Sequence, residues 1–210
     1  SRMTRRHTII ALVPEGTSDD ALIPHLQELL VREGLPEVIG QGRNYPGSVI
    51  DKLKAVKSEE SSVDLIFVHR DADTPQSDSR RSEIKSAAER VDLTVPVVPL
   101  VPVQELEAWL LVDEGAIRLV AGKPAGREAL GLPALSRLEH VASPKDVLKA
   151  ALLKASESSG RRKRTVKNKF PEQRRTLLER LEVDGPLRSL SAWKQLEHDI
   201  AEVVKHLQAT

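Results

Sequence analysis

The chain has 210 residues, no cysteine and a formal net charge of +1 at pH 7. A chain of this length forms one sizeable domain, or a domain with a helical appendage. The absence of cysteine excludes disulfides, cysteine-based zinc sites and thiol nucleophiles. No apolar run approaches the roughly 20 residues that a membrane-spanning helix needs, so we expect a soluble, cytoplasmic protein.

The first half of the chain alternates segments typical of strands and of helices. Runs rich in Val, Ile and Leu predict strands, and apolar residues at a spacing of three or four predict helices. The predicted strands are residues 8–13, 37–40, 63–68 and 95–101, and the predicted helices are residues 21–33, 49–56 and 82–91. We expect 63–68 to be a buried parallel strand. Two prolines indicate that the strand at 95–101 is an edge strand or is short.

Strand signals stop after residue 101. We expect a helix to open directly after the last strand, within residues 102–113. Further helices are predicted at residues 115–120, 147–155, 171–181 and 191–207. The alternation in the first half predicts an α/β fold, with a Rossmann-like core and a mainly parallel sheet over residues 3–115. Residues 116–210 are predicted to form a helical C-terminal region.

Acidic side chains follow three of the four predicted strands. Glu15 follows the first strand, Asp71 and Asp73 follow the third, and Glu105 and Glu107 follow the fourth. Ligands of open α/β sheets bind beyond the carboxyl ends of the strands, so these acids are candidates for one site. Carboxylate oxygens suit Mg²⁺ or Mn²⁺. Glu105 and Glu107 would lie about 200° apart on a helix, which leaves open which of them is the ligand.

Each acid alone has a simpler explanation as a loop or helix-start residue, but coincidence at three strand ends favours a site. The histidines contribute no metal-binding pair by their spacing. We expect His25 and His69 to be ordinary helix and strand-end residues.

A basic segment covers residues 161–180, with nine basic and two acidic residues, so the rest of the chain is net acidic. Such a run is most often a solvated helix. Beside an acidic metal site, it also fits a surface that contacts the nucleic-acid backbone without reading sequence. The candidate contact residues are Arg161, Arg162, Lys163, Arg164, Lys167 and Lys169.

Three segments carry a resemblance to a known fold: VPEGTSDD at 13–20, VHRDAD at 68–73 and VQELEAWLL at 103–111. They resemble the TOPRIM fold of topoisomerases, primases and overcoming-lysogenization-defect nucleases. The resemblance is closer to a bacterial TOPRIM-like family, domain-of-unknown-function family 4276, which is often associated with ATPase genes in mobile and defence loci. A Ser-Pro-Lys-Asp helix start and the basic segment extend the resemblance over most of the chain.

The resemblance implies a Mg²⁺-dependent nuclease of DNA or RNA, within a phage-defence or mobile-element module and beside a partner ATPase. It implies that Asp71 and Asp73 hold one Mg²⁺, and that Glu15 bridges or acts as general base. Glu105 or Glu107 would complete the ligands of a second ion. The chain departs from the family at Pro14, before the glutamate, and at residues 69–70, His-Arg, which place a cation beside the site.

Two alternatives remain open at the level of sequence. The run ending in Asp71 and Asp73 also matches the nucleophile motif of haloacid-dehalogenase-type phosphatases, in which Asp71 would be phosphorylated and Asp73 would act as acid and base. That family's later acidic pair has no counterpart at a strand end here. The other alternative is a catalytically weak TOPRIM-like scaffold that binds nucleic acid or a partner ATPase.

Overall fold

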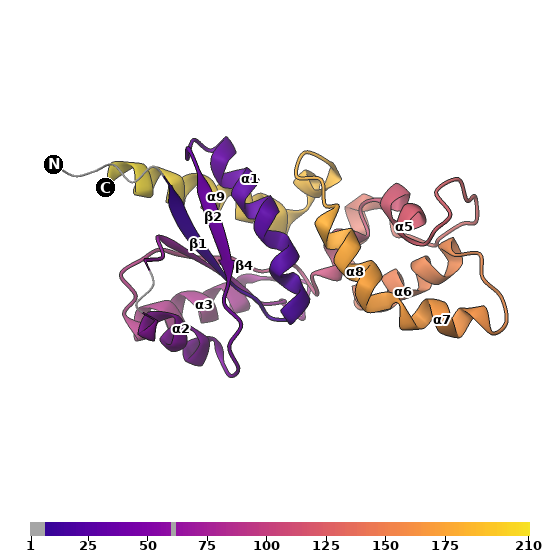
Figure 1. The fold of residues 1–210 in the computed structure, drawn as a ribbon, viewed down its shortest axis with the longest axis horizontal. Coiled ribbons are helices and arrows are strands. Elements are labelled where there is room, and N and C mark those ends of the chain that lie inside the picture. The colour runs from indigo at the N-terminus through magenta and orange to yellow at the C-terminus, as the bar shows by residue number, and fades with distance from the viewer. Residues whose placement is uncertain (1–6, 60–61) are drawn as a thin grey trace. The chain divides into compact units, whose positions relative to one another are not determined.

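The computed structural model describes residues 7–59 and 62–210, which form two compact units (Figure 1). The sheet unit contains the described residues up to Arg70, with Ser77–Val101 and Ala192–Thr210. The helical unit contains Asp71–Gln76 and Pro102–Ser191. The chain therefore passes between the units more than once.

Four parallel strands form the sheet in the described part of the chain. They are β1 (Thr8–Val13), β2 (Val38–Gly42), β3 (Leu65–His69) and β4 (Val97–Leu100), in the order β2-β1-β3-β4. All five residues of β3 are buried, as expected of an inner strand of a parallel sheet. The prediction of an α/β fold with a parallel sheet is confirmed, and the proline-containing strand lies at an edge.

Helices cover both faces of the sheet. They are α1 (Ile23–Arg32), α2 (Val49–Ser58) and α3 (Asp78–Val91), each connecting two parallel strands. Right-handed crossovers put α1 on one face and α2 and α3 on the other, because β2 and β3 lie on opposite sides of β1. Figure 1 shows this arrangement.

The last helix, α9 (Ser191–Ala209), returns to the sheet unit. Arg81 on α3 lies 2.9 Å from Asp199, and the Gln208 side chain donates to the carbonyl of Gly34 after α1. Trp193 lies on the buried face of this helix. The sequence predicted the helix but not its partner, so the units do not follow the predicted boundary at residue 115.

The helical unit is built from short helices. They are α4 (Glu107–Leu110), α5 (Glu114–Val120), η2 (Leu135–His140), α6 (Pro144–Ala155), α7 (Arg162–Asn168), α8 (Phe170–Glu179) and η3 (Pro186–Ser189). Pro144 opens α6, where its missing N–H costs nothing. No helix among the described residues has the length and apolar character needed to cross a lipid bilayer.

The helix expected within residues 102–113 is reduced to the single turn α4. Gln104, just before it, has a left-handed φ of 59°. Its backbone exchanges hydrogen bonds with the segment after β3, from Gln104 N–H to the carbonyl of Thr74 and from Asp73 N–H to the carbonyl of Gln104. This pairing fixes Gln104 in a non-helical backbone conformation, so the helix begins only at Glu107.

Candidate metal site at the carboxyl edge of the sheet

The strand order reverses between β1 and β3. From β1 the chain goes to β2 on one side of the sheet, and from β2 it returns to β3 on the other side. Connections leaving the carboxyl ends of two such strands diverge, and ligands of open α/β sheets bind at this point. Glu15 lies two residues after β1, and His69 is the last residue of β3.

Glu15, His69 and Asp71 form the candidate ligand set. Each offers one ligand atom, and these atoms all lie within 4.8 Å of one another. Glu15 is exposed, His69 is buried and Asp71 is half-buried. Two carboxylates and an imidazole fit a divalent cation by donor type. The sequence predicted Glu15 and Asp71 as ligands and did not include His69.

A buried carboxylate, Asp19, holds His69 in place. Only 1% of the His69 surface and 2% of the Asp19 surface are exposed. The Asp19 carboxylate lies 3.1 Å from His69 Nδ1 and accepts a hydrogen bond from the Gly16 N–H at 3.1 Å. The Glu15 N–H also points at Nδ1 as a donor, at the longer distance of 3.5 Å. The shorter contact to a carboxylate indicates that Nδ1 carries the proton and donates it to Asp19.

Two cationic side chains flank the same edge of the sheet. Lys52 of α2 is buried, and its ammonium donates to the carbonyl of Pro14 at 3.3 Å. Arg70 lies 3.9 Å from a carboxylate oxygen of Glu15 and 3.4 Å from Glu83. These cations offset the acidic charge of the site and suit an anionic ligand such as a phosphate.

Asp71 and Asp73 differ in their surroundings. The Leu106 N–H donates to Asp71 Oδ1 at 2.9 Å, which fixes the carboxylate at the start of α4. Asp73 is exposed and has a left-handed φ of 57°. Asp73, unlike Asp71, does not belong to the ligand set found among the described residues.

Glu105 and Glu107 are distinguished by their partners in the helical unit. Glu107 is buried, and the Arg174 guanidinium on α8 donates to its carboxylate at 2.8 Å. Glu105 is half-buried; burial and then the nearby charges of Glu107 and Asp71 raise its pKa above the ordinary value. The Lys145 N–H, at the start of α6, opposes this rise by donating to Glu105. Neither belongs to the ligand set of the described residues.

The basic segment is exposed along its first helix. Arg161, Arg162, Lys163, Arg164, Lys167 and Lys169 are all exposed, on or beside α7. Helix α7 also borders an open apolar pocket of about 410 Å³ between α6 and α8. Lys149 lies over the Phe170 ring there, 5.1 Å from its centre. The segment therefore presents a cationic surface beside an apolar one.

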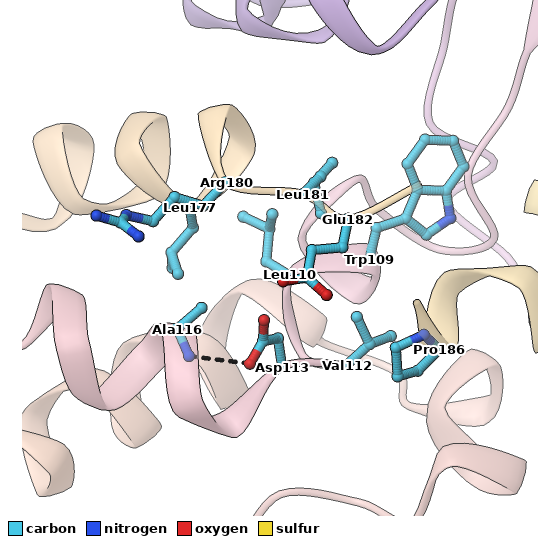
Figure 2. A pocket seen from close by; sticks show the side chains of 10 residues that line it. All are labelled: Trp109, Leu110, Val112, Asp113, Ala116, Leu177, Arg180, Leu181, Glu182 and Pro186. Atoms are coloured by element: carbon cyan, nitrogen blue, oxygen red, sulfur yellow. Dashed lines mark hydrogen bonds between the residues drawn. The ribbon is translucent and has the colours of Figure 1, made fainter. Parts of the chain in front are cut away.

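A second cavity in the helical unit is too small for a ligand (Figure 2). It lies between α4, α5 and α8, beside Trp109 and Leu177, and its volume is about 20 Å³. This is space for one water molecule. Asp113 at its border accepts a hydrogen bond from the Ala116 N–H and thereby caps α5. Trp109 is a core residue.

Comparison of the chain with models of known protein families, with curated proteins and with solved structures finds no match.

Proposed function

We propose that the carboxyl edge of β1 and β3 binds a divalent cation, Mg²⁺ or Mn²⁺, and that the protein hydrolyses phosphodiester bonds of DNA or RNA. The observation that carries this proposal is the grouping of Glu15, His69 and Asp71 at the point where the strand order reverses. The TOPRIM-like sequence of residues 13–20 and 68–73 supports the same chemistry.

The residues of the site have different roles in the proposed hydrolysis. Glu15, His69 and Asp71 would hold the cation, which when bound would supply an activated water molecule and stabilise negative charge on the phosphate. Glu15 is exposed, so it can take the proton of the attacking water as general base. Asp71 is oriented for ligation by the Leu106 N–H. Arg70 and Lys52 provide positive charge that favours a phosphate at this edge.

The basic segment supports nucleic acid as the substrate class. Its six cationic side chains around α7 are exposed, which suits contacts to successive phosphates. Contacts of this kind position a nucleic acid without selecting its sequence. On the family resemblance, we infer a cytoplasmic role in a phage-defence or mobile-element module with a partner ATPase.

A cleavage assay tests the proposal. Single- and double-stranded DNA and RNA are incubated with the protein and Mg²⁺ or Mn²⁺, and compared with the variants Glu15→Gln and Asp71→Ala. We expect both variants to lose cleavage by at least about 100-fold, the scale at which general base and metal ligands act. Glu89→Gln, an exposed acid on α3, is the matched control and should cleave normally. Equal cleavage by wild type and both variants would remove the proposed site.

A further inference from the structure

We propose that His69 is a metal ligand through Nε2 and that Asp19 is its positioning residue, so that the site selects a first-row transition-metal ion such as Mn²⁺ over Mg²⁺. The inference rests on the proposed metal site and specifies which cofactor it takes. Neither His69 nor Asp19 belongs to the ligand set expected from the sequence.

The burial of both side chains is the first step of the argument. The imidazole of His69 and the carboxylate of Asp19, which are 1% and 2% exposed, have lost nearly all contact with solvent water. Such groups are found in proteins when their polar atoms have specific partners. Asp19 has the Gly16 N–H and His69 Nδ1, each at 3.1 Å. The chain therefore holds a polar pair at the end of its most buried strand.

The protonation of the ring is the second step. A carboxylate only accepts hydrogen bonds, so the nitrogen 3.1 Å from Asp19 is the one that carries a proton. In the neutral ring, Nε2 then holds the lone pair. A histidine whose second nitrogen donates to a carboxylate is the usual arrangement of metal-ligating histidines, because the carboxylate fixes the ring and raises its basicity.

The position of the ring is the third step. His69 shares a site with Glu15, and their ligand atoms lie within 4.8 Å of each other. Asp19 is itself fixed by a tight turn, since the Asp19 N–H donates to the carbonyl of Gly16 while its side chain accepts the Gly16 N–H. That same turn follows directly from Glu15. One short segment, residues 15–19, thus supplies both a ligand and the residue that orients another ligand.

The donor set determines the preferred ion. Mg²⁺ favours oxygen ligands and keeps several of its waters, whereas imidazole suits Mn²⁺, Fe²⁺, Co²⁺ and Zn²⁺ increasingly well. A site of only carboxylates would accept Mg²⁺ readily. Replacing one carboxylate by His69 moves the preference toward the transition metals.

Pulsed electron paramagnetic resonance of the Mn²⁺-loaded protein tests the inference directly. The spectrum should show coupling of Mn²⁺ to a ¹⁴N nucleus, and the coupling should disappear in His69→Gln. His25→Gln, which replaces another buried histidine on α1, should keep it. Mn²⁺ bound without nitrogen coupling in the wild-type protein would overturn the inference, and this result does not depend on the folding of any variant.

A titration of Asp19→Asn tests the positioning role. This variant keeps the shape of the side chain but removes its charge, and we expect Mn²⁺ affinity to fall about 10- to 100-fold. Mg²⁺ affinity should be lower than that of Mn²⁺ in the wild type. If Mg²⁺ and Mn²⁺ bind equally tightly and cleavage proceeds, the inference about His69 is wrong while the proposed function stands. If neither ion binds, both fail.

Discussion

The ion pair between Glu107 and Arg174 is expected to contribute strongly to the stability of the helical unit, and substitution of Arg174 tests this. Arg174 on α8 donates to the Glu107 carboxylate at 2.8 Å, and the two side chains are only 13% and 6% exposed. Removing one partner of such a pair leaves an uncompensated buried charge, which costs about 3–5 kcal/mol. Because Arg174 keeps some exposure, we expect Arg174→Met to lose about 3 kcal/mol of unfolding free energy.

The neighbouring arginine provides the matched control. Arg175 pairs with Glu179 at 3.2 Å, but these side chains are 57% and 54% exposed. Arg175→Met should therefore cost only about 0.3–0.5 kcal/mol. Urea unfolding of both variants, followed by circular dichroism, measures the difference. Losses within 1 kcal/mol of each other would refute the reasoning, and Glu107 would then no longer be explained as a structural residue.

Two further predictions concern Glu105 and the basic segment. Because burial and neighbouring carboxylates raise the pKa of Glu105, ionising it destabilises the folded state, and this loss sets in as pH rises above the ordinary value of 4.5. Glu105→Gln should thus unfold at a higher temperature than wild type at pH 7, with the gap closing below pH 4.5; an equal gap at both pH values would contradict this. Reversing the charges at residues 161–164 should weaken nucleic-acid binding at every sequence and flatten its salt dependence. An unchanged salt slope, measured by fluorescence anisotropy, would assign the segment another role.

The sheet could be predicted from sequence because its signals are local. The β-branched run at residues 8–13 became β1, and the apolar run before Asp71 became the buried strand β3. The expectation that Glu15 and Asp71 lie at one edge followed from parallel strands alone. These inferences needed only the pattern of neighbouring residues.

The parts that could not be predicted depend on contacts distant in sequence. Asp19 and His69 are 50 positions apart in the sequence, and no local pattern indicates that they contact each other. In the sequence, Asp19 is one of several neighbouring residues, 17–20, whose side chains suit the start of a helix. Asp71 and Asp73 were expected to act together. The backbone of Asp73 has a left-handed φ of 57°, which is neither helical nor strand-like and which only the structure shows. Likewise, only the structure shows that Glu107 pairs with Arg174.

Calorimetric titration of Mn²⁺ and Mg²⁺ into the wild-type protein and into a Glu15→Gln/Asp71→Asn variant tests the central claim most directly. The account predicts that Mn²⁺ binds to the wild type and that the double substitution abolishes this binding while the thermal unfolding transition persists. Equal binding by the two proteins, or no binding by the wild type with and without nucleic acid, would contradict a metal site at the carboxyl edge of β1 and β3.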